Sequence, residues 1–401
     1  MTSEWHEVPL RELVGYISKG IAPSYAEEAS ESTIRVLNQK CNRNFRISYG
    51  DSRLHDTRKK KVPPERYVKP DDILINSTGA GTAGRIAQIE DVPSATTIDG
   101  HMILIRSNGK VTQKFLGYAL KAHQWEVLQL DEGSTGQTEL NRDRLLDEIM
   151  INYPVSLDEQ NAIVGTLESI DRKLIVNEQL NDNLEQQAQS YFQELFVDNA
   201  SPEWTTGTIS DLGTVVGGST PSKAKPEYYT ESGIAWITPK DLSINKSKFV
   251  SHGENDITEL GLRNSSASLM PEGTVLFSSR APIGYIAIAA GEVTTNQGFK
   301  SVVPKPEIGT PFVYFFLKNT LPVIEGMASG STFKEVSGST MKNVSAVIPD
   351  AETLAKFSDF CAPIFAQQRI LEEQNQSLAT LRDNLLPKLM SGEIDVSAVQ
   401  L

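Results

Sequence analysis

The strongest concentration of positive charge in this sequence lies in its first hundred residues. Between Arg35 and Arg66, ten basic residues stand against three acidic ones, a local net charge of +7, and four basic residues are consecutive at positions 58–61. Lys and Arg side chains supply the contacts that proteins make with nucleic-acid phosphates. A run of charge is also common on an ordinary solvated surface. The window therefore indicates either a phosphate-binding surface or a solvated one, in a chain whose net charge is −13.

Small polar side chains follow apolar runs at four places where they could meet base edges. These places are Asn76 to Gly79, Thr97 to His101, Ser278 to Arg280 and Thr295 to Lys300. An Arg can bond guanine through two donors, and an Asn or Gln can bond adenine. The same residue types also form simple turns, so both readings stay open here.

No catalytic signature accompanies these residues. The sequence contains no Gly-x-x-x-x-Gly-Lys-[Ser/Thr] phosphate loop, no His-Glu-x-x-His, no Asn-Pro-Pro-[Phe/Tyr] and no glycine fingerprint for a dinucleotide. The five histidines lie far apart and lack the spacing of metal ligands. The acidic pairs Asp71-Asp72 and Asp131-Glu132 are the remaining candidates for carboxylate chemistry, and neither has a supporting base.

Length and cysteine content limit the class of protein. A chain of 401 residues is expected to form two or three folding units. Its two cysteines, Cys41 and Cys361, provide neither a disulfide framework nor a Cys-x-x-Cys metal site. No window has the length and apolarity of a membrane span, and the first residues do not resemble a signal peptide. We expect a soluble cytoplasmic protein.

The chain contains an internal repeat with an offset that drifts from about 200 to about 194 residues. Glu4-Trp5 recurs as Glu203-Trp204, and Gly84-x-Ile-Ala recurs as Gly284-x-Ile-Ala. Further matches in the same order pair residues 34–40 with 234–240, 70–77 with 271–278, 96–100 with 294–298, and the Gly-Ser-Thr of 133–135 with that of 330–332. Matches that keep their order predict two similar domains.

Each half combines short strand-like runs with one moderate helix. The runs are separated by Gly, Pro, Ser and Asn clusters, which predicts loop-rich mixed domains. The moderate helices are expected at Gln113 to Leu130 and at Thr310 to Ala328, the second interrupted by Pro322.

Each half then ends in a long helix with a heptad seam. Ser156-Leu157-Asp158-Glu159 has the pattern of a capping box, and seam positions spaced four and three apart run from Ile163 to Leu195. The same spacing recurs from Phe357 to Leu389. Asn181 and Asn375 hold equivalent seam positions, where they are either tolerated or fix the register. A narrow apolar stripe needs a partner, and a globular domain separates the two helices, so we expect an antiparallel intramolecular pair with a pseudo-twofold axis.

The predicted fold is therefore α+β, with two mixed α/β domains, each followed by a long helix of an antiparallel coiled coil. The expected segments are a first domain at 1–155, a first helix at 156–197, a second domain at 198–350, a second helix at 351–392 and a tail at 393–401.

The end of the chain carries the clearest family signature. Residues 385–396 read LLPKLMSGEIDV, and Pro154 is followed by Asp158-Glu159-Gln160 at the start of the first long helix. Together with the layout of two domains and two helices, these segments resemble the specificity subunits of type I restriction-modification systems. The second helix departs from the pattern, because Asp350-Ala351-Glu352-Thr353 stands where Asp-Glu-Gln is expected and Pro363 could kink its first turns.

The resemblance implies a subunit without catalytic activity that reads a split DNA target. It implies two adenine-methylating modification subunits and ATP-driven restriction subunits as partners, and double-stranded DNA as ligand. S-adenosylmethionine, ATP and Mg²⁺ are expected on those partners, with no cofactor and no metal on this chain.

Within this resemblance the basic and polar residues are predicted to contact DNA. Those of the first domain are Arg43, Arg46, Arg58, Lys59, Lys60, Lys61, Asn76, Ser77, Thr78, Arg85, Asp99 and His101. Those of the second domain are Lys223, Lys225, Lys240, Ser278, Ser279, Arg280, Asn296, Gln297, Lys300 and Lys334, and Lys246 and Lys248 are further lysines to test.

Two other classes of protein remain as alternatives. A two-headed coiled-coil scaffold that binds protein would suit the acidic first helix, in which residues 157–196 have a net charge of −6. An unrecognised nuclease or hydrolase would have to use one of the two acidic pairs.

Overall fold

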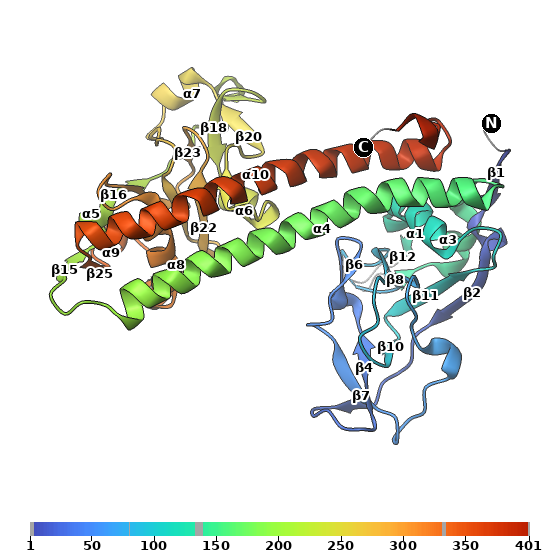
Figure 1. Ribbon diagram of the computed structural model, residues 1–401. Helices are drawn as coiled ribbons and strands as arrows, with labels where there is room; N and C mark the ends of the chain where they lie inside the picture. Colours follow the sequence, from blue (N-terminus) through green and yellow to red (C-terminus); the bar gives the residue numbers. More distant parts are fainter. Residues whose placement is uncertain (1–3, 80, 133–138, 331–333, 400–401) are drawn as a thin grey trace. The chain divides into compact units, whose positions relative to one another are not determined.

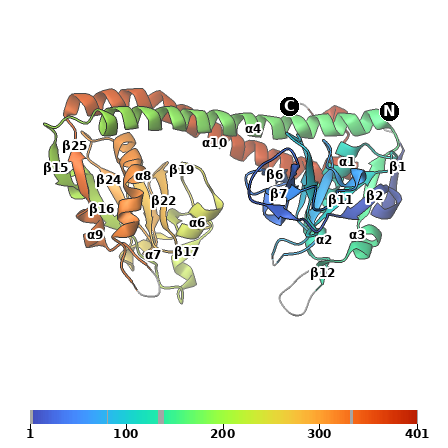
Figure 2. The same ribbon diagram turned by 90° about the horizontal axis from the view of Figure 1, so that it is seen from below.

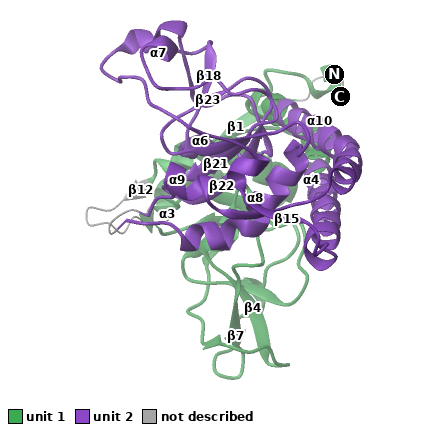
Figure 3. Cartoon of the chain, turned by 90° about the vertical axis from the view of Figure 1, so that its left-hand side faces the viewer, with its two compact units in different colours: residues 1–174, 378–401 green, residues 175–377 purple. Residues whose placement is uncertain are grey.

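The computed structural model describes residues 4–79, 81–132, 139–330 and 334–399. The chain divides into two compact units, residues 1–174 with 378–401 and residues 175–377 (Figure 3). Each unit therefore contains one globular part and one segment of each long helix. The repeated Gly-Ser-Thr at 133–135 and most of its counterpart at 330–332 lie outside the described residues.

The globular part of the first unit is built on two four-stranded sheets (Figure 1). One has the order β2 (Val14–Lys19), β11 (Met102–Ser107), β8 (Ile73–Asn76), β9 (Ile86–Gln88), and the other β10 (Thr96–Ile98), β4 (Thr33–Leu37), β7 (Arg53–Asp56), β3 (Tyr25–Ala26). Three strand pairs complete it: β1 (Trp5–Pro9) with β14 (Met150–Pro154), β5 (Asn42–Arg43) with β6 (Arg46–Ile47), and β12 (Asp131–Glu132) with β13 (Glu139–Leu140). Its helices are α1 (Gln113–Ala122), α2 (Gln124–Leu128) and α3 (Arg142–Glu148), with one-turn helices at 10–12, 39–41 and 64–66.

The globular part of the second unit repeats this topology. Its larger sheet has the order β16 (Gly213–Gly217), β24 (Lys300–Pro304), β21 (Val275–Ser279), β22 (Ile283–Ala289), β19 (Phe249–Val250), and its smaller sheet β23 (Thr294–Thr295), β18 (Ile234–Ile237), β20 (Asn255–Ile257), β17 (Tyr229–Thr230). The pair β15 (Thr205–Thr208) and β25 (Ser345–Ile348) matches β1 and β14. The helices are α5 (Ile209–Leu212), α6 (Pro239–Ile244), α7 (Glu259–Arg263), α8 (Thr310–Gly326) and α9 (Gly338–Lys342), with a one-turn helix at 226–228. The predicted duplication is confirmed for the two main sheets and the terminal strand pair. The pairs β5–β6 and β12–β13 belong to the first unit alone among the described residues, and β19 is an additional edge strand of the second.

The moderate helices differ from the prediction in both halves. The helix expected at 113–130 is broken at His123, because the side chain of Gln124 bonds the turn between β8 and β9 through Ile86 N and Gly84 O (2.9 and 2.8 Å). In the second half the predicted interruption is wrong, since α8 continues through Pro322. Pro322 is exposed, so water can bond the carbonyl group that its missing N–H leaves without a helical donor.

Each long helix begins at a polar cap. The helix α4 (Leu157–Gln193, continued by a π-helical turn at 194–198) starts where the Ser156 hydroxyl accepts a hydrogen bond from Glu159 N at 3.3 Å. The side chain of Gln160 is fully buried and bonds Pro154 O and Thr112 N. The helix α10 (Ala351–Met390) starts at Asp350, whose carboxylate accepts from Thr353 N at 2.9 Å. The residues that depart from the family pattern therefore still form a cap, and α10 continues through Pro363.

The two long helices pack against each other within each unit (Figures 1 and 2). In the first unit Ile163 and Leu167 of α4 share a core with Leu386 and Leu389 of α10. In the second unit Ala188 and Phe192 pack with the segment of α10 from Leu354 to Phe365. The beginning of one helix thus meets the end of the other, which confirms the antiparallel coiled coil.

The seam is polar near its centre. Asn177 is buried and donates to Asn375 Oδ1 at 2.9 Å, while Asn181 donates to Glu372 Oε1 at 3.4 Å. Asn375 is therefore paired with Asn177, although sequence equivalence had matched it with Asn181. The Asn177–Asn375 bond links one position on each helix, which favours the interpretation that Asn375 fixes the register.

Candidate nucleic-acid interface

The two units build the same loop at the end of a central strand. After β8, Ser77 N donates to His101 O at 2.8 Å, and Ser77 O accepts from Leu140 N at 2.8 Å. At the last residue of β21, Ser279 N donates to Gly298 O at 2.7 Å, and Ser279 O accepts from Val336 N at 3.0 Å. The next residue, Thr78 or Arg280, emerges from this framework partly exposed.

A close glycine contact completes the framework in each unit. A Cβ on Gly20 would lie 2.1 Å from Asp99 O, and one on Gly218 would lie 2.0 Å from Asn296 O. Only glycine fits where the backbones approach this closely. The segments at Gly20 and Gly218 are thereby held against the loops at 97–101 and 295–300.

In the first unit this loop presents a small polar cluster. Thr78 Oγ1 lies 2.7 Å from His101 Nδ1, and the His101 ring is exposed. Glu139 forms a backbone bridge with Thr78, and its side chain pairs with Lys19. The cluster contains hydrogen-bond donors and acceptors, and side chains of both charges. Base edges present donors and acceptors, whereas phosphates present only acceptors, so the cluster suits base edges better than phosphates.

A basic hairpin adjoins this cluster. Strands β5 and β6 are joined by Asn44 and Phe45, both with positive φ (52° and 61°), so Arg43 and Arg46 face each other across a two-residue turn. Asn42 anchors the hairpin, because its side chain donates to Asn76 Oδ1 at 3.2 Å and to Arg85 O at 2.8 Å. Arg43 is exposed, while Arg46 and Arg85 are half-buried.

The consecutive basic residues at 58–61 follow β7 and are exposed. Arg58 bonds the buried carboxylate of Asp56 through two nitrogens (3.2 and 3.1 Å), and this bond lowers the pKa of Asp56 to about 2. Lys60 Nζ donates to Ala22 O at 2.9 Å. Arg58 and Lys60 are thus held in place by bonds within the protein.

In the second unit the loop presents two cations on one carboxylate. Arg280 Nη1 and Lys300 Nζ each lie 3.4 Å from an oxygen of Glu335. Lys334 is exposed beside them, and the exposed side chain of Gln297 accepts a hydrogen bond from Thr220 Oγ1. In this arrangement the partly exposed guanidinium group of Arg280 could hydrogen-bond a base edge.

The other lysines of the second domain fall into two groups. Lys223, Lys225, Lys240 and Lys246 are exposed, with Lys225 beside Glu227 (3.7 Å) and Lys240 beside Glu254 (2.6 Å). Lys248 is buried, so the suggestion that it contacts DNA is wrong for this structure. A single lysine in a polar loop gives no sign in the sequence that its partner lies on a distant helix.

Six predicted contact residues have internal roles in the structure. Asn76 donates to Gln39 O, Asp99 accepts from His101 N, and Asn296 accepts from Gly298 N. The hydroxyl groups of Ser77, Ser278 and Ser279 donate to the carbonyl oxygens of Gly100, Pro282 and Gly298. All except Asn296 are buried. We correct the assignment of the five buried residues, because their polar atoms hold the loops. Asn296 stays a predicted contact, because its side chain is half-buried.

Sequence reasoning missed Lys19, Glu139 and Glu335. The two glutamates occupy matching places in the repeat, three or four residues after the repeated Gly-Ser-Thr. That spacing was a usable signal, but an acidic residue does not suggest a DNA contact.

Half-buried carboxylates on α4 bind the globular part of each unit. In the first unit Asp171 accepts from Tyr118 Oη (2.9 Å), Lys121 Nζ (3.1 Å) and Arg382 Nη1 (3.2 Å). Burial by itself raises the pKa of Asp171, but the adjacent cations and hydrogen bonds outweigh it and lower the pKa.

The second unit has an equivalent arrangement around Glu185. Its carboxylate accepts from Lys248 Nζ (2.7 Å), from Tyr314 Oη (3.1 Å) and from Lys318. Lys248 also donates to Gln368 Oε1 at 2.8 Å and lies 3.6 Å from the centre of the Phe365 ring. Burial opposes the charge of Glu185, but the two ammonium groups lower its pKa to about 2. These groups attach the globular part to the helices in each unit.

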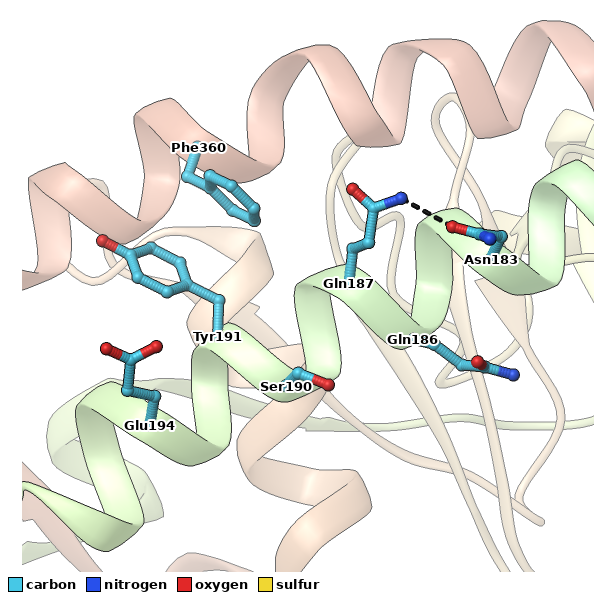
Figure 4. Close-up of a pocket in the computed structure, with 7 residues that line it drawn as sticks. All are labelled: Asn183, Gln186, Gln187, Ser190, Tyr191, Glu194 and Phe360. Carbon is cyan, nitrogen blue, oxygen red and sulfur yellow. Dashed lines mark hydrogen bonds between the residues drawn. The ribbon is translucent and has the colours of Figure 1, made fainter.

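A hollow of about 450 Å³ lies on the helix pair of the second unit (Figure 4). The rings of Tyr191 from α4 and Phe360 from α10 lie 4.5 Å apart at its apolar end, and Gln187 donates to Asn183 at 2.6 Å. Glu194 is the only carboxylate among the lining residues, all of which are described. The hollow can serve as a contact surface, but its lining lacks the pair of titratable groups that acid–base catalysis needs.

The acidic pairs show no catalytic geometry in the described residues. Asp72 is buried and bonded by Arg106 through two nitrogens at 2.7 Å, and Asp71 is not joined by a second carboxylate or histidine at hydrogen-bond distance. The backbone of Asp131 and Glu132 forms β12. Across the described ranges no group of three His, Cys, Asp or Glu side chains could hold a metal ion, and no helix has the length and apolarity to cross a membrane.

Comparison with known proteins gives one consistent family. The model of the type I restriction modification DNA specificity domain matches residues 2–186 and 202–381. The type I restriction enzyme MjaIX specificity subunit of Methanocaldococcus jannaschii is 38% identical over 191 residues, which cover 45% of this chain and 44% of that protein. The HindI specificity subunit of Haemophilus influenzae is 27% identical over 194 residues, covering 48% and 42%. The chain thus matches less than half the length of these two relatives.

A solved structure shares the fold over most of the chain. The S subunit of a type I restriction-modification system from M. genitalium covers 97% of this chain and 96% of its own, with 17% sequence identity and a TM-score of 0.61.

Proposed function

Because the chain belongs to the type I restriction-modification DNA specificity domain family, we propose that it is the DNA-reading subunit of such a system. Each globular part reads one short portion of a split target on double-stranded DNA. The chain itself performs no chemistry. The modification subunits methylate adenine with S-adenosylmethionine, and the restriction subunits use ATP and Mg²⁺, all in the cytoplasm.

The observation that carries this proposal is the duplicated recognition loop. Two loops with the same backbone hydrogen bonds, at Ser77 and Ser279, present different side chains at the next position, Thr78 and Arg280. A repeated framework with different side chains suits two readers of different sequences. Phosphate contacts from the run at 58–61 and from the hairpin arginines supply affinity, and the loops supply specificity.

The long helices are the proposed attachment for the modification subunits. Their exposed surface in the second unit includes the hollow lined by Tyr191, Phe360 and polar side chains of α4. Aromatic groups beside polar side chains are typical of protein interfaces. The partner must turn the target adenine out of the duplex into its own pocket.

Single-molecule mapping of methylated adenines in the host tests the proposal. We expect a motif of two specific portions separated by unspecified bases, with one modified adenine on each strand. A continuous motif would contradict two independent readers. A gel shift with the modification subunit present separates this function from a protein scaffold, which would leave duplex DNA unshifted.

A further inference from the structure

We propose that Glu335 determines specificity in the second half of the target by positioning Arg280 to read a guanine. This inference rests on the proposed function. Glu335 would not touch the base. It would act through the guanidinium group, so it is a positioning residue.

The backbone of Glu335 is fixed by hydrogen bonds on both sides. Glu335 N donates to Ser329 O at 2.9 Å, Ser329 N donates to Glu335 O at 3.1 Å, and Glu335 also bridges the backbone of Arg280. The neighbouring Val336 N donates to Ser279 O. The carboxylate therefore starts from a rigid position beside the loop.

The side chain of Glu335 divides its two oxygens between two cations. Oε2 lies 3.4 Å from Arg280 Nη1, and Oε1 lies 3.4 Å from Lys300 Nζ. About a third of the Arg280 side chain is exposed, against 15% of the Lys300 side chain. Lys300 is thus the enclosed partner that holds the carboxylate, and Arg280 is the partner that reaches the surface.

This arrangement fits guanine recognition. A guanidinium group has five N–H donors in a rigid fork, so binding a carboxylate at Nη1 leaves another edge for the O6 and N7 atoms of guanine. An arginine that is already oriented loses less rotamer freedom when it binds. Two cations on one carboxylate also leave one positive charge at the site, which favours the approach of DNA.

The first unit provides a matched control. Glu139 occupies the corresponding place, but its side chain pairs with Lys19, and Thr78 stands where Arg280 does. Glu139 therefore has no arginine to position in its loop. We expect Glu139→Gln to leave the base preference of the second half unchanged, because no part of its loop contacts Arg280 or Glu335 in the described residues.

The test is methylation mapping with the complete complex, using Glu335→Gln, Arg280→Ala, the double variant and Glu139→Gln. Glu335→Gln should reduce discrimination at one G·C pair of the second half about tenfold, equivalent to about 1.4 kcal/mol, and leave the first half unchanged. Arg280→Ala should relax the same pair, and the double variant should add nothing further because both changes remove one interaction.

Several outcomes would overturn the inference. Relaxation of different base pairs by the two single variants would show that Glu335 does not act through Arg280. The inference would also be overturned if either single variant left the second half of the DNA motif unchanged. A wild-type motif whose second half contains no G·C pair would overturn it too. If Glu335→Gln abolished methylation, the affinity of the complex for duplexes that differ at that base pair would be measured instead. Equal discrimination between these duplexes by variant and wild type would contradict the proposal. A wild-type motif that is not split would instead refute the proposed function.

Discussion

Replacing Lys248 by Met should destabilise the second unit by about 3 kcal/mol at pH 7. Its buried ammonium group pairs with the half-buried carboxylate of Glu185. Removing one partner of a fully buried pair costs about 3–5 kcal/mol, because the other charge is left without compensation. Lys318 and Tyr314 remain bound to Glu185, which places the cost at the lower end. Met retains most of the volume of the lysine stem, so little cavity is added.

Thermal unfolding of the full chain measures this effect. For a unit of about 200 residues, 3 kcal/mol corresponds to a fall in Tm of about 6–12 °C. The double variant Lys248→Met with Glu185→Gln should recover part of the loss, because it removes the stranded charge and keeps an oxygen that accepts from Tyr314 Oη. Lys240→Met is the control, since that lysine forms an exposed pair with Glu254 and should change stability by less than about 0.5 kcal/mol.

The pH dependence provides a second check on the same pair. The pKa of Glu185 is about 2 in the folded chain, against an ordinary value of 4.5, so the unfolded chain binds more protons between these values. Its stabilising contribution is complete above pH 4.5 and falls by about 2 kcal/mol on acidification to pH 3. The difference between wild type and Lys248→Met should therefore narrow in acid. A Lys248→Met chain as stable as wild type at pH 7, or a double variant less stable than the single one, would refute the reasoning.

Three further predictions follow from the surface, the domains and the seam. Replacing residues 58–61 by Ala should weaken DNA binding and lower the salt slope by as much as about 0.9 per lost phosphate contact, with the motif unchanged in methylation mapping. Exchanging residues 1–155 for another such domain should change one half of the motif in the same assay, and changes in both halves would refute modularity. Asn177→Leu should cost about 0.5–1.5 kcal/mol in urea unfolding because it removes the hydrogen bond to Asn375 Oδ1 in the seam, and an unchanged urea midpoint would show that this bond does not stabilise the helix pair.

The fold was largely predictable because its signals are periodic or repeated. The duplication, the heptad seam and the antiparallel pair all depend on spacing, which a sequence shows directly. The errors concern single residues whose effect is set by distant partners. The helix break at His123 arises because Gln124 bonds the turn near Gly84, and α8 survives Pro322 because that residue faces solvent.

The candidate site was predictable in place but not in detail. The loops after β8 and β21 were located correctly, yet each strand extends one or two residues further than the apolar run suggests. Asn76, Ser278 and Ser279 are consequently inside the fold, bonded to groups between 4 and 37 residues away. Polar composition indicates a loop, but it does not distinguish a side chain that faces a ligand from one that supports the loop.

The acidic first helix need not indicate an acidic binding surface. Three of its carboxylates bind lysines of the globular parts: Glu168 binds Lys114, Asp171 binds Lys121, and Glu185 binds Lys248 and Lys318. Much of the negative charge that favoured a protein scaffold is therefore used inside each unit. The lysines used in this way cannot contribute to phosphate binding. The exposed basic residues remain for it: the run at 58–61, Arg43, Lys223, Lys225, Lys240, Lys246 and Lys334. A chain with a net charge of −13 can then bind DNA, because binding depends on the local charge of the contact surface. Some of its cations attach the globular parts to the helices, and others remain for contact with the ligand.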